Sequence, residues 1–194
     1  MSLRVCVLPA LSLALSLAVG CGGEPPEKEM QQAQGALDAA HAVGADKYAA
    51  AEFTAAQLAL ANAQEAVTQR DYRLALDRAL DSRERAQNAA KVAADGKASA
   101  KVDADRALTA ADAQLQAADA RLKAAESGKF SAQRLAGSRR VIDTARIAVQ
   151  EARTTFETGD YLDVPAKAKA ATASLPAALQ ELDATATALA RRKR

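Results

Sequence analysis

The chain has 194 residues, of which 53 are alanine and none is tryptophan, and its formal net charge at pH 7 is +2. So few large apolar side chains exclude a fold with a thick hydrophobic core. Nearly balanced charge argues against a disordered chain and gives no signature of nucleic-acid binding. Alanine has the highest intrinsic helix propensity, and its small side chain lets helix axes approach to about 8 Å. We therefore expect an all-α protein.

Residues 1–20 have the pattern of a secretory signal peptide. Arg4 precedes an apolar run over residues 5–19, which is too short and too weakly flanked for a transmembrane span. The run ends in the letters LAVGC at Cys21, and this ending resembles the lipobox of bacterial prolipoproteins. The alternative is an ordinary secretory signal that happens to contain a cysteine.

The lipobox resemblance implies that Cys21 becomes the first residue and carries a diacylglycerol and an N-acyl chain. Each buried methylene contributes about 0.8 kcal/mol, so several chains give a stable membrane anchor. Residues 21–26 then form a short tether, and the mature chain holds no second cysteine for a disulfide. Gly22 is not the aspartate that retains such proteins at the inner membrane, which implies the outer membrane, facing the periplasm.

Apolar residues recur every seven positions in two places. The two sets are related by a shift of 89 residues: Phe53, Leu60 and Val67 in one set, and Ile142, Val149 and Phe156 in the other. The same shift carries the pair Asp71-Tyr72 onto Asp160-Tyr161. We interpret this as a tandem duplication, with a first unit at 27–97, a second at 98–190 and a basic tail at 191–194.

Each unit has the pattern of three helices. We predict them near residues 27–43, 46–69, 71–95, 101–126, 131–158 and 161–190. Large residues alternating with alanine along one seam indicate coiled-coil-like packing, and short loops favour antiparallel neighbours. The prediction is an elongated antiparallel bundle of two related three-helix units. Gly96 is a weak break, so a continuous helix over about 71–126 stays open, and Pro176 is expected to kink the last helix.

The stretch from Asp46 to Ala90 is similar to an uncharacterised domain family of alanine-rich Gram-negative envelope lipoproteins. The residues that carry this similarity are Gln69-Arg70-Asp71-Tyr72, Ala75, Ala79, Ala86, Ala89 and Ala90. The pattern of this stretch also looks like the second helix of a tetratricopeptide hairpin, but the Trp and the Leu-Gly pair of that repeat are missing. The resemblance implies a helical fold and an envelope location, and it implies no activity.

His41 is the only histidine, and with Asp38 it distantly resembles the Glu-x-x-His motif of di-iron bundles. Such a site needs two histidines and several more carboxylates, so we favour an exposed histidine and predict no metal. No serine has a histidine partner, and no glycine-rich phosphate loop is present. The sequence therefore predicts neither an enzyme nor a cofactor.

Acidic residues line one face of the third predicted helix at Asp77, Asp81 and Glu84. One interpretation is a cation site. We favour the other, a ladder of exposed ion pairs in which Arg73 precedes Asp77 by four residues and Arg85 follows Asp81 by four. Each such pair contributes a few tenths of a kcal/mol.

Two tyrosines, Tyr72 and Tyr161, occupy equivalent positions under the 89-residue shift. Tyrosine is enriched in binding hot spots, so both are candidates for a partner contact. We favour a structural role in which each ring anchors the start of a helix against its neighbour while the hydroxyl reaches water.

The chain ends in the basic run Arg191, Arg192, Lys193 and Arg194. This tail suits contact with anionic lipid headgroups, acidic glycans or peptidoglycan carboxylates. The alternative is a charged tail that only keeps the last helix soluble.

Together these features predict a non-catalytic envelope lipoprotein that acts as a helical spacer or protein-interaction adaptor. The alternative is a lipoprotein that binds peptidoglycan or another anionic polymer through its basic tail. The expected partners are the membrane, through lipid on Cys21, and an envelope protein or peptidoglycan, without nucleic acid. The oligomeric state stays open.

Overall fold

The computed structural model describes residues 23–128 and 130–192, which form seven α-helices and no strand. The expectation of an all-α protein is confirmed. The helices are α1 (Glu27–Ala42), α2 (Ala45–Tyr48), α3 (Ala50–Thr68), α4 (Tyr72–Ser127), α5 (Ala132–Glu157), α6 (Val164–Thr172) and α7 (Leu175–Arg192).

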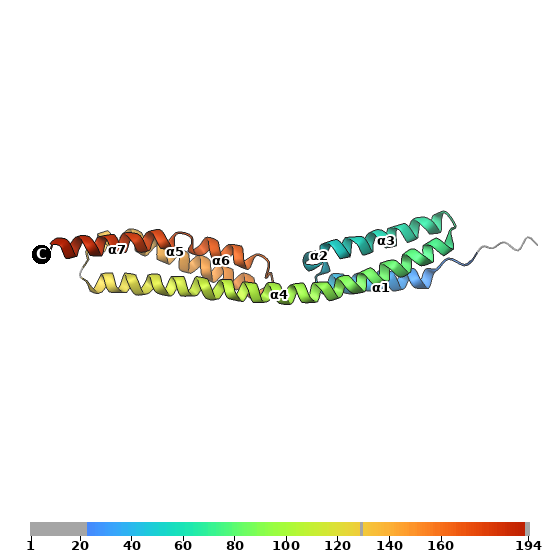
Figure 1. Cartoon of the computed structure of the whole chain (residues 1–194), viewed down its shortest axis with the longest axis horizontal. Coiled ribbons are helices and arrows are strands. Elements are labelled where there is room, and N and C mark those ends of the chain that lie inside the picture. Colours follow the sequence, from blue (N-terminus) through green and yellow to red (C-terminus); the bar gives the residue numbers. More distant parts are fainter. Residues whose placement is uncertain (1–22, 129, 193–194) are drawn as a thin grey trace, which may run out of the picture.

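One long helix, α4, connects all the others (Figure 1). Its 56 residues span about 84 Å at 1.5 Å per residue. Helices α1, α2 and α3 pack on its first part, and α5, α6 and α7 pack on its second part. We call these the N-terminal half (residues 27–97) and the C-terminal half (residues 98–190). Residues 23–27 lie at one end of the molecule and the end of α7 lies at the other (Figure 1).

Gly96 lies inside α4, so the helices predicted separately before and after it are one helix. Glycine in a helix interior costs about 1 kcal/mol relative to alanine. A Cβ atom at this position would lie 3.0 Å from the carbonyl oxygen of Tyr48. The missing side chain therefore lets α2 approach α4 closely, and the glycine does not end the helix.

The helix predicted over 46–69 is divided in two at Ala49. This residue has φ −145° and ψ 44°, outside the helical region, and it separates α2 from α3. Its side chain is buried in a core cluster that also contains residues of α1, α3 and α4. The chain thus changes direction here without exposing apolar surface.

The helix predicted over 161–190 begins later and is also divided. Helix α6 begins at Val164, with Pro165 in its first turn, and α7 begins at Leu175, with Pro176 as its second residue. A proline in the first turn lacks only an N–H that would have no helical partner. The expected kink at Pro176 was therefore wrong, because the chain ends one helix at Thr172 and starts another.

Two turns separated by 89 residues share a left-handed residue and the same pattern of backbone hydrogen bonds. Arg70 (φ 58°) and Gly159 (φ 87°) both lie in the left-handed region, and each follows the last turn of a helix. In the first turn, the backbone N–H of Arg70 donates to Val67 O (3.0 Å) and that of Asp71 donates to Ala66 O (2.9 Å). In the second turn, Gly159 donates to Phe156 O (3.1 Å) and Asp160 donates to Thr155 O (3.3 Å), which are the corresponding positions. A non-glycine residue in this region costs about 1–2 kcal/mol, so the first turn is the more strained one.

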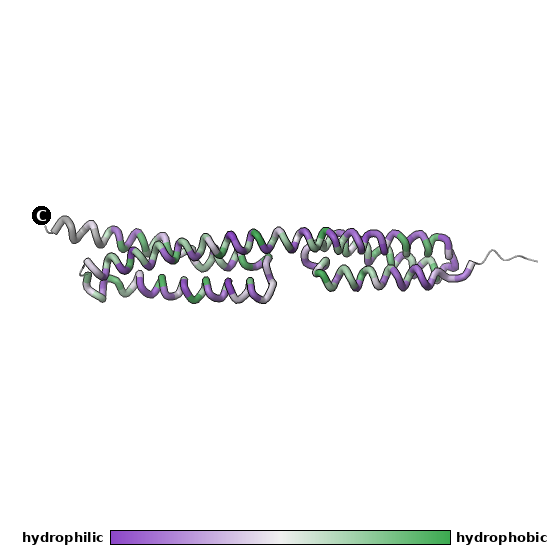
Figure 2. The backbone as a smooth tube through the Cα atoms, turned by 90° about the horizontal axis from the view of Figure 1, so that it is seen from below, coloured by the Kyte–Doolittle hydropathy of each residue, from purple (hydrophilic) through white to green (hydrophobic). Residues whose placement is uncertain are grey.

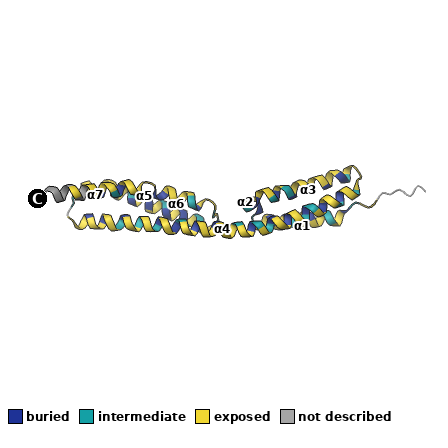
Figure 3. Cartoon of the chain, viewed as in Figure 1, coloured by how far each residue is buried: buried dark blue, intermediate teal, exposed yellow. Residues whose placement is uncertain are grey.

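The core of the described residues consists mainly of alanine, with a smaller number of Leu, Ile, Val and Phe side chains. Apolar and polar residues alternate along the helices (Figure 2), and the buried residues of the described chain lie where the helices pack together (Figure 3). In α4 the buried residues recur at intervals of three, four and seven: Ala75, Ala79, Ser82, Ala86, Ala89, Ala93, Ala100, Ala104, Leu108, Ala111, Ala118, Leu122 and Ala125. This spacing is typical of coiled-coil-like packing.

Candidate functional site

The residues that the sequence singled out for chemistry lie at the two ends of the chain. Cys21 lies outside the described residues. Arg191 and Arg192 close α7, and Lys193 and Arg194 lie outside the described residues. Within residues 23–128 and 130–192, no helix is both long and apolar enough to cross a membrane.

A groove of about 360 Å³ runs between α1 and α3 in the N-terminal half. Its floor is apolar and comes from Leu37, Phe53 and Leu60, all of them buried. Its rim is polar and is formed by Gln34, Asp38, His41, Gln57 and Gln64. Three of these five polar side chains are amides, so the rim presents hydrogen-bonding groups more than charge.

His41 and Asp38 lie on this rim but do not form the beginning of a metal site. His41 is exposed, with its ring centroid 6.0 Å from that of Phe53. One oxygen of Asp38 accepts a 2.9 Å hydrogen bond from the side-chain amide of Gln34. The part of the chain that the structure describes contains no group of three or more His, Cys, Asp or Glu residues placed to hold a metal ion.

The corresponding helix pair of the C-terminal half, α4 and α5, is crossed by ion pairs. Arg146 forms an ion pair with Asp119, and Arg153 forms one with Asp112, each with an N···O distance of 2.7 Å. Arg139 pairs with Glu126. Arg146 and Arg153 lie 89 residues after Gln57 and Gln64. Two amides on the rim of the groove between α1 and α3 thus correspond to arginines that bridge α4 and α5.

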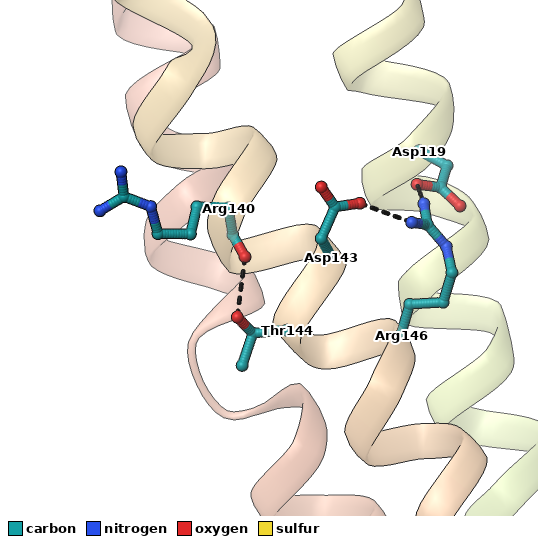
Figure 4. Close-up of polar contacts among 5 residues, drawn as sticks. All are labelled: Asp119, Arg140, Asp143, Thr144 and Arg146. Atoms are coloured by element: carbon teal, nitrogen blue, oxygen red, sulfur yellow. Dashed lines mark hydrogen bonds and ion pairs between the residues drawn. The ribbon is translucent and has the colours of Figure 1, made fainter.

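Arg146 also holds a carboxylate of its own helix, Asp143, at 2.6 Å (Figure 4). The hydrogen bond to Asp143 and the charge of Asp119 raise the pKa of Arg146 above its ordinary value. Arg140, three residues before Asp143, directs its guanidinium away from these carboxylates, and its backbone carbonyl accepts a 2.9 Å hydrogen bond from the hydroxyl of Thr144 (Figure 4). One face of α5 is therefore charge-neutralised, while Arg140 on another face has no carboxylate partner among the residues that the structure describes.

The two halves meet beside the middle of α4. Lys47 Nζ lies 3.1 Å from Asp160 Oδ1, and the Tyr48 hydroxyl donates to the carbonyl oxygen of Gly159 at 3.4 Å. These contacts border a hollow of about 350 Å³ between α2 and the turn before α6. The hydrogen bond and the charge of Asp160 raise the pKa of Lys47 above its ordinary value of 10.5. We call this contact the waist.

The waist was not predicted from the sequence. Its one sequence signal is Gly96, which interrupts neither the heptad pattern nor the helix and therefore needs another reason to be there. The reason is the carbonyl group of Tyr48, which lies against it. Nothing in the local sequence around Tyr48 indicates that partner.

The acidic face of α4 forms only part of the expected ladder. Arg85 Nε lies 2.8 Å from Asp81 Oδ1, which confirms that pair. Arg73 and Asp77 form no ion pair within the described part of the chain, so this rung of the ladder was wrong. Arg83 instead reaches across to α1 and donates to Gln32 at 2.6 Å.

The two tyrosines differ in their surroundings. Tyr72 is the first residue of α4 and is half-buried, and the adjacent Asp71 caps the helix by accepting a 3.0 Å bond from the backbone N–H of Leu74. Tyr161 is also half-buried, with its ring 5.1 Å from that of Phe156, but it precedes α6 by three residues. Only the first tyrosine therefore begins a helix, whereas the ring of the second packs against Phe156 in a core cluster.

Comparison with known proteins adds no relative. No protein-family model matches the chain, no curated protein matches its sequence, and no solved structure matches its fold.

Proposed function

We propose that this chain is a membrane-anchored, non-catalytic envelope lipoprotein that acts as a helical spacer or adaptor. In this proposal Cys21 carries lipid and the body is an elongated antiparallel bundle facing the periplasm. The observation that supports it best is α4, which runs through both halves and separates residues 23–27 from the end of α7 (Figure 1). A rigid helix of about 84 Å keeps two attachment points apart.

The proposal includes a tandem duplication of a three-helix unit, related to the alanine-rich envelope lipoprotein family named above. Positions 89 residues apart support it, because they are buried in both halves: Phe53 and Ile142, Ala56 and Ala145, Leu60 and Val149, Ala63 and Ala152, Ala75 and Val164, and Ala79 and Ala168. The matching turns at Arg70 and Gly159 also support it.

As an adaptor, the protein would use the groove between α1 and α3, and we propose that one amphipathic helix of an envelope protein occupies it. The lining side chains recur at one-turn intervals along two helices, which suits a third helix laid between them. The uncharged amides of the rim favour a partner helix with polar, uncharged flanks. At the matching positions of the C-terminal half the amides are replaced by arginines, whose ion pairs bridge α4 and α5.

Site-specific photocrosslinking in cells tests the adaptor role. A crosslinking residue at Gln57 or Gln64 is expected to capture one defined envelope protein. The same residue at Gln150, exposed on α5 of the other half, is the matched control and is expected to capture none. Identical products from all three positions, or none from any, would contradict the adaptor role.

The alternative function is binding of an anionic polymer such as peptidoglycan through residues 191–194. The observation that favours it is the position of Arg191 and Arg192 at the end of the molecule farthest from residues 23–27 (Figure 1). Deletion of residues 191–194 is expected to reduce co-sedimentation with purified peptidoglycan. Unchanged sedimentation would count against this function and leave the adaptor role intact.

Lipid attachment has its own test. Cells fed a clickable fatty acid are expected to label the natural chain and not the Cys21→Ser variant. Label that persists on the serine variant would contradict the anchor.

A further inference from the structure

The turn between α3 and α4 lies at the end of the molecule where the described residues begin (Figure 1). We call residues 69–74 the tip. Helices α1 and α4 run side by side in the same direction, and the Arg83 guanidinium donates to the Gln32 side chain at 2.6 Å. Counted back from that pair, the start of α1 is level with position 78 of α4. Because α4 begins six residues earlier, at Tyr72, the tip projects about 9 Å beyond the start of α1.

The chain between the folded body and the proposed lipid is short. Cys21 lies six residues before the start of α1, and six residues span at most about 20 Å when fully extended. The tip already covers about 9 Å of that distance. For a rod that stands on the membrane, the gap between the tip and the membrane is therefore at most about 11 Å, and any bend in the tether closes it.

The tip carries side chains that suit a phospholipid surface. Arg70 and Arg73 are exposed and form no ion pair within the described part of the chain. Leu74 is 38% exposed although it is large and apolar, and Tyr72 is half-buried. Arginine binds phosphate groups, leucine enters the boundary of the acyl chains, and tyrosine is enriched at membrane–water interfaces. The Asp71 carboxylate between the two arginines accepts from the backbone N–H of Leu74 and so caps α4.

Arg70 has a backbone conformation that does not suit its side chain. Its φ of 58° lies in the left-handed region, where a Cβ atom brings a steric penalty that glycine avoids. The corresponding turn has Gly159 with φ 87°, and that turn lies at the waist. Glycine thus occurs in the turn far from the tether and arginine in the turn beside it. Because the arginine adds strain, its presence here indicates a function for the side chain.

Acidic residues near the tip leave its positive charge in place. Glu27 and Glu29 belong to α1, whose start lies about 9 Å behind the tip, and charges separated by more than about 8 Å are largely screened at physiological ionic strength. Glu65 accepts a 3.2 Å hydrogen bond from the side-chain amide of Gln69. Glu24 belongs to the tether. With two arginines and one aspartate, the tip itself has a net charge of +1.

We propose that the tip rests on the surface of the phospholipid membrane that holds the lipid of Cys21, with Arg70 and Arg73 on lipid phosphates and Leu74 in the interface. This inference rests on the proposed function and adds a second membrane contact to the lipid anchor. Two contacts at the same end of the molecule fix its direction, which a flexible tether alone does not. Helix α4 then projects away from the membrane, as a spacer requires.

A tryptophan reporter tests the proposal, because the natural chain contains no tryptophan. The full lipidated chain carrying Tyr72→Trp is reconstituted in vesicles of phosphatidylethanolamine and phosphatidylglycerol that contain brominated phospholipid, and the vesicles are isolated by flotation. We expect the bromine atoms to quench this tryptophan. The matched control, Tyr161→Trp, replaces the corresponding half-buried tyrosine of the other half and is expected to keep its fluorescence. Helix content by circular dichroism checks that both variants fold.

Arginine variants of the Tyr72→Trp chain separate membrane contact from fold stability. Arg70→Gly relieves the strained turn, so we expect the melting temperature to rise while the ratio of membrane-bound to free tip falls about fivefold. Addition of Arg73→Gln is expected to lower this ratio further. The matched control, Lys91→Gln, removes an exposed cation of α4 far from the tip and is expected to leave the quenching unchanged.

Each outcome supports or overturns a stated part of the proposal. A Tyr72→Trp chain that floats with the vesicles but is not quenched overturns the inference and leaves the lipid anchor intact. Equal quenching of the Tyr72→Trp and Tyr161→Trp chains overturns the upright arrangement, because the rod then lies flat on the membrane. Unchanged quenching after the loss of both arginines overturns their contact with phosphate. A natural chain that does not float contradicts the anchor of the proposed function, and the inference with it.

Discussion

The two halves of this molecule pack the same kind of helices on α4 but treat the space between two of them differently. In the N-terminal half, α1 and α3 leave a groove with an apolar floor and an amide rim. In the C-terminal half, Arg146 and Arg153 cross from α5 to carboxylates on α4. Similar backbones thus carry one surface open to a partner and one closed by its own charges, and a few side chains decide which.

The first prediction breaks each half by itself. Phe53 and Ile142 occupy corresponding core positions, 7% and 0% exposed. We expect Phe53→Ala and Ile142→Ala each to lower the free energy of unfolding by about 3 kcal/mol, through lost burial and the cavity left behind. Hydrogen exchange should accelerate mainly in α3 for the first variant and in α5 for the second. Equal acceleration in both halves would show that they do not respond separately.

The second prediction compares two glycines inside helices. A Cβ at Gly35 of α1 meets nothing within 4 Å, whereas a Cβ at Gly96 meets the Tyr48 carbonyl oxygen at 3.0 Å. Gly35→Ala is expected to stabilise the protein by about 0.5–1 kcal/mol through helix propensity. Gly96→Ala is expected to gain none of this, because the waist must shift. Urea unfolding measures both, and equal stabilisation would show that Tyr48 does not need the space.

The third prediction transfers a bridge from one half to the other. The 89-residue shift places Asp119 over Met30 and Arg146 over Gln57. In a double-mutant cycle, Met30→Asp with Gln57→Arg is expected to show a coupling of about 0.5 kcal/mol, which is typical of an exposed ion pair. Crosslinking from Gln64 to the partner helix should fall at the same time. Absence of coupling would show that the halves do not correspond in register.

The fourth and smallest effect is a pH dependence of the waist. Asp160 raises the pKa of Lys47 in the folded protein above its ordinary value of 10.5. The contact therefore stabilises the protein at pH values below 10.5 and ceases to do so as the pH rises through the folded pKa. The difference in melting temperature between the natural chain and Lys47→Gln is expected to vanish above that pH. A difference that persists there would assign the effect to packing and not to the charge.

Much of the fold was predictable because helical periodicity is a local property. The seven-residue spacing of Phe53 and Ile142 with their neighbours identified the buried faces, and Asp71 identified a helix start. The breaks were harder to predict. Ala49 leaves the helical region although alanine favours it, because the chain must turn between α2 and α3 where both meet α4.

The candidate sites were predictable only where they lie in one run of sequence. The tail at 191–194 is such a run, and Cys21 is recognised by the residues directly before it. The groove was missed because an open and a bridged helix pair have the same heptads.

The sequence by itself determined that the chain is helical and which faces are buried, because propensity and periodicity act within a few residues. It also carried the 89-residue correspondence between the halves. The tertiary structure alone decided that α4 is continuous, that Tyr48 and Lys47 meet the turn at 159–160, and which charges stay unpaired. Those features depend on contacts between groups up to 113 residues apart in the sequence. A local sequence pattern carries no information about contacts at that separation.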